Sequence, residues 1–379
     1  MVTTQAAVLR AADGPFQIET VEVNEPAAGE VVVQIAGVGI CHTDFLPRTP
    51  VAKPPIVVGH EGAGTIVAVG PGVTNRAVGD RVILSFDHCG QCRNCGDGQP
   101  GYCREFWPRN MSGYRAGRST TIRDENGEAV MGQWFGQSSF AEYSVVKATN
   151  TVPVDPSLPI ELLGPLSCGV MTGAGSVFNS LAVRPGNSLA VFGTGTVGLS
   201  AIMAARVAGA TRIVAVDRNP DRLALAQKFG ATDTVVSDSG DLTSAIKALA
   251  PDGLDFSLDT TGVPEVITAA IDALRMRGVC GCVGVQLKPL VLQPNQLALG
   301  RTVKGILVGD ASPHQLIPRL IELWQAGRFP FDDLIETFPL SAIDAAEQAM
   351  TSGRVIKPVL IPKPASSTPG TPKFTKDQQ

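Results

Sequence analysis

The sequence predicts an α/β protein that combines an all-β, barrel-like region with a doubly wound parallel sheet. Up to about residue 150, short runs rich in Val, Gly and Pro are bounded by turn residues. From about 170 to 310, strand patterns alternate with helix patterns, as in a parallel sheet with crossover helices. At 379 residues the chain is long enough for two domains of ordinary size, each with its own core.

Within the first region, alternating apolar residues predict strands at 30–36 and 64–70. In the second region, the strand before a glycine-rich turn is expected at 188–192, and an alanine-rich helix follows. The remaining expected elements, in order, are a helix at 197–208, a strand at 212–216, a helix at 221–229, and strands at 234–237, 254–258, 278–284 and 303–308. A helix at 314–325 then precedes a short mixed segment that ends at Ile361.

Composition and charge exclude several classes of partner. Hydrophobic residues make up 44% and charged residues 17%, which is typical of a globular chain. A net charge of −4 argues against nucleic acid or an anionic membrane as the main partner. The first ten residues lack a signal-peptide pattern, and no apolar run is long enough to span a membrane. We therefore expect a cytoplasmic protein, with a polar, proline-broken and disordered tail at 365–379.

Four cysteines share one short loop, 89–103, with the spacing C-x2-C-x2-C-x7-C. This spacing lets four thiolates converge on one tetrahedral ion, as a closed structural zinc site requires. The four are Cys89, Cys92, Cys95 and Cys103. The alternative is a disulfide framework, which is typical of small secreted proteins and not of a chain of this length and kind.

A second set of potential metal ligands lies outside that loop. It consists of Cys41, the adjacent pair His60 and Glu61, and Cys168. Two sets in one chain predict one zinc that holds a loop together and a second zinc that takes part in chemistry.

Residues 193–198 read Gly-Thr-Gly-Thr-Val-Gly, directly after an expected strand and at the start of an expected helix. Gly193 permits the tight turn, Gly195 lets backbone approach a pyrophosphate, and Gly198 allows close helix–strand packing. The expected helix follows, and the free N–H groups at its N-terminus, near Thr196 and Val197, favour phosphate. The sequence therefore predicts a dinucleotide site.

Asp217 closes the next expected strand, where its carboxylate can accept hydrogen bonds from the adenosine ribose. The same charge repels a 2′-phosphate, which favours NAD over NADP. Arg218 and Arg222 lie nearby, however, and a cation there could accommodate the phosphate of NADP.

Taken together, these motifs resemble the zinc-dependent medium-chain alcohol dehydrogenases, over about residues 5 to 362. The resemblance is strongest in Gly59-His60-Glu61-Gly-Ala-Gly64, in the four-cysteine loop and around Cys168. Within the family the chain is most similar to the aryl-alcohol (benzyl alcohol) and geraniol dehydrogenase branch. Residues 41–44, the aromatic insertion within 106–140, and Gly309-Asp310 carry that likeness.

The resemblance implies a discontinuous GroES-like catalytic domain, 1–169 and 311–364, around a Rossmann cofactor domain, 170–310. It also implies two zinc ions per chain, NAD, a small apolar alcohol or aldehyde as substrate, and a homodimer or homotetramer. The activity would be reversible hydride transfer between a primary aryl or allylic alcohol and NAD. Two alternatives are a glutathione-dependent formaldehyde dehydrogenase, for which Arg109, Arg115 and Arg118 leave room, and a non-catalytic dinucleotide-binding structural protein.

Residue roles follow from the same resemblance. Cys41, His60 and Cys168 match the ligands of the catalytic zinc, with Glu61 behind or on the metal. Asp44 matches an acid that orients His60, and Thr43 matches the hydroxyl that relays the alcohol proton. The resemblance places three further residues at the cofactor: Thr172 beside the nicotinamide, and His42 and Lys357 near the pyrophosphate.

Two features concern the substrate and its proton. Many family members have a histidine where this chain has Leu46, so the proton relay must end at the ribose, at water or at another group.

Eight of the twenty aromatic residues lie between Tyr102 and Tyr143. They could form the walls of a pocket for a flat or branched alcohol, or merely pin the insertion to the barrel; the sequence leaves both open.

Overall fold

The computed structural model describes residues 1–115, 117–238 and 241–362. Contacts divide the chain into two compact units, one formed by Met1–Cys168 together with the segment from Asp332 onwards, the other by Gly169–Phe331. The first boundary between the units, 168/169, is one residue from the expected boundary at 169/170. The second lies after α9 (Pro313–Gln325), not at 310/311, because α9 packs against α3 (Gly169–Gly175). The tail expected to be disordered, 365–379, lies outside the described residues.

The first unit is rich in β-structure, as expected. One sheet has the strand order β4-β1-β2-β7-β8, and the other has β10-β6-β5-β3-β18-β17 with β9 also paired to β3. The strands are β1 Val2–Leu9, β2 Phe16–Val23, β3 Glu30–Gly39, β4 Ile56–Val57, β5 Glu61–Val69, β6 Arg81–Leu84, β7 Ile122–Asp124, β8 Ala129–Val130, β9 Tyr143–Lys147, β10 Thr151–Pro153, β17 Ile335–Pro339 and β18 Lys357–Ile361. The helices are α1 Arg93–Gly96, α2 Phe106–Asn110 and α10 Ile343–Thr351.

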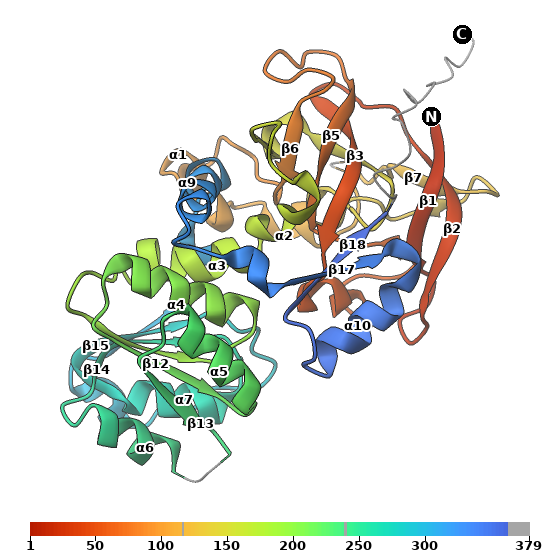
Figure 1. Ribbon diagram of the computed structural model, residues 1–379. Coiled ribbons are helices and arrows are strands. Elements are labelled where there is room, and N and C mark those ends of the chain that lie inside the picture. The colour runs from red at the N-terminus through yellow and green to blue at the C-terminus, as the bar shows by residue number, and fades with distance from the viewer. Residues whose placement is uncertain (116, 239–240, 363–379) are drawn as a thin grey trace. The chain divides into compact units, whose positions relative to one another are not determined.

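The second unit contains the expected parallel sheet, ordered β13-β12-β11-β14-β15-β16. Its strands are β11 Ser188–Phe192, β12 Arg212–Asp217, β13 Asp233–Val236, β14 Leu254–Asp259, β15 Leu274–Cys282 and β16 Thr302–Gly305. Its helices, besides α3 and α9, are α4 Thr196–Ala208, α5 Pro220–Phe229, α6 Leu242–Leu249, α7 Pro264–Asp272 and α8 Pro294–Ala298. The order reverses at β11, which produces the doubly wound arrangement. Figure 1 shows helices on both sides of these strands, with α6 and α7 together on one side.

The predicted fold class is confirmed, and the differences are local. Helices α6 and α7 had no expectation in the sequence, although Asp241 caps α6 by accepting a hydrogen bond from the Ser244 N–H at 3.2 Å. Strand β16 ends at Gly305, before the expected 308, because Val308 and Asp310 adopt positive φ and turn the chain. The apolar faces of α6 and α7 pack under the sheet through Ile246, Ile267 and other buried residues.

Candidate metal centres and dinucleotide site

The four cysteines of loop 89–103 converge. One sulfur atom from each residue lies within 4.8 Å of all the others. Backbone N–H groups point at the sulfurs: Cys92 donates to Cys89 Sγ at 3.3 Å, and Cys89 donates to Cys103 Sγ at 3.3 Å. A hydrogen bond from the Arg104 backbone lowers the pKa of Cys92 to about 6, which favours its thiolate. All eight cysteines of the chain are free thiols, so the disulfide alternative finds no support.

The second set also converges. Ligand atoms of Cys41, His60, Glu61 and Cys168 all lie within 4.8 Å of one another, and His60 Nε2 is 3.2 Å from Cys168 Sγ. Cys41 precedes the 3-10 segment His42–Arg48. His60 immediately precedes β5, which Glu61 opens, and Cys168 ends the first unit. Both sets fit zinc: four thiolates suit a closed structural site, and two thiolates with an imidazole suit a site that keeps one position open.

Asp44 ties this second set together. It is fully buried, and its Oδ1 lies 2.6 Å from His60 Nδ1 while accepting the Gly59 N–H at 3.0 Å. Its Oδ2 accepts the Cys41 N–H at 3.1 Å. Burial alone would lower the pKa of His60, but the charge and hydrogen bond of Asp44 outweigh it and raise that pKa. One carboxylate thus holds the backbone beside both ligands and directs Nε2 toward the sulfur of Cys168.

Lys357 forms a buried ion pair with Glu61. It is buried in β18, and its ammonium donates to both carboxylate oxygens of Glu61 at 2.9 Å and to the Ile40 carbonyl at 2.8 Å. Its three donors are thus directed to groups of the first unit. Burial raises the pKa of Glu61 to about 7, although the charge of Lys357 opposes that shift. Gly39 makes room for this pair, since a Cβ there would lie 2.0 Å from Glu61 Oε2.

Thr43 and His42 follow Cys41 directly. Thr43 is half-buried, and its hydroxyl forms no hydrogen bond with any residue that the structure describes. His42 is exposed and Leu46 is half-buried, both in the same 3-10 segment. The Thr43 hydroxyl is therefore available to another group.

The glycine-rich turn has the geometry that the motif predicted. Gly193 has φ +89°, and a Cβ on Gly198 would lie 1.8 Å from the Gly193 carbonyl oxygen. Helix α4 begins after Gly195, whose carbonyl accepts the first helical hydrogen bond, from Leu199 at 2.9 Å. Thr196 and Val197 are the first two residues of α4, so their N–H groups stand at its N-terminus.

Asp217, at the end of β12, has a second task that sequence reasoning missed. Its Oδ2 accepts the Thr194 N–H at 2.7 Å and the Thr194 hydroxyl at 2.8 Å, so it holds the glycine-rich turn. Burial opposes ionisation, but these hydrogen bonds and the charge of Arg222 lower the pKa of Asp217. Arg222 is half-buried and Arg218 is exposed. A threonine after Gly193 is the sequence signal that could have indicated this link.

Thr172 lies in α3, where it is buried. Its carbonyl accepts a hydrogen bond from the Ser176 hydroxyl at 2.7 Å, at the junction of α3 with the π-helical turn Ser176–Ser180.

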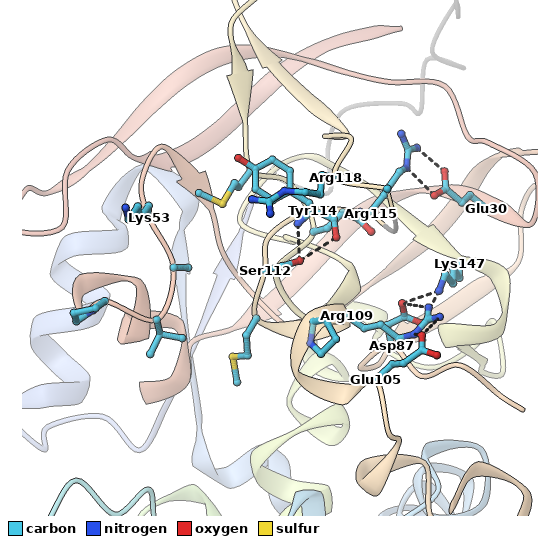
Figure 2. A pocket seen from close by; sticks show the side chains of 18 residues that line it. Glu30, Lys53, Asp87, Glu105, Arg109, Ser112, Tyr114, Arg115, Arg118 and Lys147 are labelled. Carbon is cyan, nitrogen blue, oxygen red and sulfur yellow. Dashed lines mark hydrogen bonds and ion pairs between the residues drawn. The ribbon is translucent and has the colours of Figure 1, made fainter. Parts of the chain in front are cut away.

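A pocket of about 700 Å³ lies in the first unit, lined by charged side chains (Figure 2). Arg109 pairs with Glu105 and Asp87, at 2.6 and 3.2 Å. Arg115 pairs with Glu30, and its guanidinium donates a hydrogen bond to each of the two carboxylate oxygens. Two of the three arginines that left room for a charged thiol adduct are thus already neutralised by neighbouring acids.

The aromatic insertion is mostly core. Trp134 and Phe140 are fully buried, whereas Trp107 is 62% exposed. Phe135 stacks on the imidazole of His60, with ring centroids 4.5 Å apart and planes 27° apart. This contact was not expected from the sequence, which held no signal that joined the two positions.

Comparison with known proteins agrees with this arrangement. A family described as alcohol dehydrogenase GroES-like domain matches residues 27–156, and one described as zinc-binding dehydrogenase matches residues 196–326. Geraniol dehydrogenase of Castellaniella defragrans is 45% identical over 95% of this chain and 98% of its own length. The class-3 alcohol dehydrogenase of Myxine glutinosa is 35% identical, with the same coverage of 95% and 98%.

Solved structures are similar over nearly the whole chain. The crystal structure of benzyl alcohol dehydrogenase from Acinetobacter calcoaceticus has a TM-score of 0.91 at 40% identity, and covers 95% of this chain and 99% of its own. An alcohol dehydrogenase zinc-binding domain protein from Burkholderia ambifaria has a TM-score of 0.93 at 45% identity, with coverage of 95% and 99%.

The chain therefore belongs to the zinc-dependent medium-chain alcohol dehydrogenase family, in its aryl-alcohol and geraniol dehydrogenase branch. It is an NAD-dependent oxidoreductase with zinc as its metal and an alcohol as its substrate. Among the described residues, no helix is both long and apolar enough to cross a membrane.

Proposed function

We propose that this enzyme reversibly oxidises primary aryl or allylic alcohols to aldehydes, with NAD as hydride acceptor. The observation that carries the proposal is the convergence of Cys41, His60 and Cys168 within 4.8 Å in a chain of this family. The substrate class is supported by the names of its relatives, a geraniol dehydrogenase at 45% identity and a benzyl alcohol dehydrogenase at 40%.

In this proposal Cys41, His60 and Cys168 hold the catalytic zinc, with Glu61 beside it, and the four cysteines of loop 89–103 hold the structural zinc. Bound zinc supplies Lewis acidity, which lowers the pKa of an alcohol hydroxyl. Asp44 keeps Nδ1 of His60 protonated, so that Nε2 is the ligand atom. Thr43 takes the alcohol proton, which fits a hydroxyl without a partner among the described residues. Leu46 cannot pass that proton on, so it leaves through the ribose or water.

The second unit is proposed to be the cofactor domain, and the first the catalytic domain. The turn at Gly193, Gly195 and Gly198, together with the N-terminus of α4, would receive the pyrophosphate. Asp217 would accept the ribose hydroxyls, while Arg218 and Arg222 flank it. His42 and Thr172 are further proposed contacts, to pyrophosphate and nicotinamide. Lys357 is a third proposed contact, near the pyrophosphate, with an ammonium that Glu61 and the Ile40 carbonyl hold in place.

We further propose a homodimer, in the cytoplasm, whose contact includes the open edge of β16. That strand ends the sheet order and has an unpaired edge in the described chain. The segment that precedes it in the chain, 276–299, exposes apolar side chains: Met276, Val285, Leu287, Val291, Leu297 and Leu299. Open strand edges invite pairing, and exposed apolar patches are typical of interfaces. A second copy of this chain would cover both features.

Two other activities have less support. A glutathione-dependent formaldehyde dehydrogenase needs free cations for a charged thiol adduct, yet Arg109 and Arg115 are already paired with acids. A non-catalytic protein would have no need of this converging ligand set with its buried, orienting Asp44.

The deciding experiment is a panel of benzyl, allylic terpenoid, short aliphatic and S-hydroxymethylglutathione substrates, assayed with NAD and with NADP. We expect the highest kcat/KM with benzyl or allylic alcohols and NAD. The proposal is overturned if the glutathione adduct or ethanol gives the highest kcat/KM.

A further inference from the structure

Phe135 occupies a backbone conformation that is unusual for its side chain. Its φ is +50°, and Ser138 three residues later has φ +57°. Bulky residues rarely adopt the left-handed region, so such a residue persists only where its surroundings hold it. Phe135 is nevertheless buried, with 7% of its surface exposed. The loop that carries it is therefore held in place by its contacts.

Those contacts lead to the turn that carries His60. Gln137 Nε2 donates to the His60 carbonyl at 2.9 Å, and its Oε1 accepts the Gly62 N–H at 3.1 Å. The Ser138 hydroxyl donates to the Val57 carbonyl at 2.6 Å. The loop is thus fastened to backbone on both sides of the His60–Glu61 pair. The hydrogen bonds of Gln137 and Ser138 therefore hold the strained loop against the turn that carries His60.

The Phe135 ring uses this position to cover one face of the His60 imidazole, at 4.5 Å between centroids. Asp44 holds the same imidazole at one edge, through Nδ1. A hydrogen bond fixes one ring atom but leaves the plane of the ring less restricted. Contact with a flat aromatic face restricts the tilt that the hydrogen bond leaves open.

Phe135 is itself packed against two further aromatic rings. Phe106 meets it edge-on, with centroids 6.2 Å apart and planes at 83°, and Trp134 meets it at 5.6 Å and 70°. The Phe106 N–H donates to the Cys103 carbonyl at 2.9 Å, directly after the four-cysteine loop. A continuous packed path thus runs from the loop of the structural zinc set to the imidazole of the second set.

We propose that Phe135 is a positioning residue that sets the plane of the His60 imidazole, so that Nε2 is aimed at the metal. The proposal rests on the assignment of His60 as a zinc ligand made above. The proposal also explains the strained backbone at Phe135, because this conformation places the aromatic ring flat against the imidazole of His60.

The test uses the purified holoenzyme and two variants, Phe135→Leu and Phe135→Tyr. Leucine keeps an apolar side chain but removes the flat ring, whereas tyrosine retains it. We expect Phe135→Leu to lose one zinc per chain to a chelator about tenfold faster, as for residues that orient a metal-bound histidine. With Co²⁺ in the same site, its visible absorption bands should shift in Phe135→Leu. Phe135→Tyr should restore the wild-type release rate and spectrum.

Phe16→Leu is the matched control, because Phe16 is also buried in the first unit and packs edge-on against Phe140 at 6.0 Å. It should leave zinc release and the cobalt spectrum unchanged. Equal effects of Phe16→Leu and Phe135→Leu, or an unchanged release rate and spectrum in a folded Phe135→Leu, would overturn the proposal. If the wild type itself holds only one zinc per chain, it is the underlying zinc assignment that fails.

Discussion

Thr43 stands two residues after Cys41, and its hydroxyl makes no hydrogen bond with the residues that the structure describes. Because Leu46 offers no onward relay, deprotonation of the alcohol should depend on this hydroxyl. Thr43→Ala should lower kcat/KM by more than about 10²-fold, the low end for a positioned proton-transfer group. Thr43→Ser should cost little. The measurement is a pH–rate profile with an alcohol deuterated at the carbinol carbon, and full activity of Thr43→Ala at every pH would refute the role.

Asp217 combines charge with support of the glycine-rich turn, and two substitutions separate these functions. Asp217→Asn removes the charge but keeps an oxygen that can accept from Thr194, whereas Asp217→Ala removes both. If charge repels the 2′-phosphate, both variants should raise the ratio of kcat/KM for NADP to that for NAD. Asp217→Ala should in addition weaken both cofactors. A ratio that stays unchanged in Asp217→Asn would show that the carboxylate does not discriminate between them.

At the scale of elements, β18 supplies the cation that neutralises Glu61 of β5. Lys357 and Glu61 are 2% and 0% exposed, so each is largely shielded from solvent and relies on the other for its charge compensation. Lys357→Met should destabilise the protein by about 3–5 kcal/mol, since removing one partner leaves a buried charge uncompensated. Adding Glu61→Gln should recover much of that loss.

Denaturant unfolding of the two variants and the wild type, in the same buffer, tests this pairing. Arg354→Met is the control, because it breaks an ion pair with Glu336 that is about half exposed and should change stability by at most about 1 kcal/mol. A Lys357→Met variant as stable as the control would show that the buried pair contributes nothing.

The two sets of proposed zinc ligands lie in different elements, so substitutions in them should have different effects: loss of turnover in one and loss of stability in the other. Cys168→Ala removes a ligand at the end of the first unit and should abolish turnover while the fold remains. Cys95→Ala should mainly lower the melting temperature, because structural zinc contributes to folding directly. Zinc content, circular dichroism and activity are measured together. Near-normal activity of Cys168→Ala with one zinc fewer would contradict the assignment of the catalytic set.

For the whole molecule, the proposed dimer predicts where substitutions change oligomeric state. Leu287 is 85% exposed and Met276 is 66% exposed, and both lie in the apolar segment that precedes β16 in the chain. Leu287→Asp together with Met276→Asp should shift the protein toward monomer in analytical ultracentrifugation. Val78→Asp, at an exposed apolar position (58%) in the first unit, is the control and should leave the oligomer intact. A double variant that sediments like the wild type would exclude this face as the contact.

Local patterns were sufficient for much of this molecule. The four-cysteine spacing predicted a set that converges, because its residues are joined by a short loop. The alternation of strands and helices predicted the parallel sheet, since each period reflects burial of one face. Helices α6 and α7 were not predicted because they are short. Their apolar faces are buried only by packing against the sheet, which the local sequence does not show.

The sequence by itself determined the family and the fold class, and it predicted the residues proposed to bind metal and dinucleotide, because these depend on residue type and short spacing. Only the tertiary structure decided that Lys357 neutralises Glu61 and that Phe135 covers His60, since such contacts join positions far apart in the chain. The first pair is separated by 296 positions. Such contacts depend on which strands pair within a sheet and on which loops pack against them. A local sequence pattern does not contain that information.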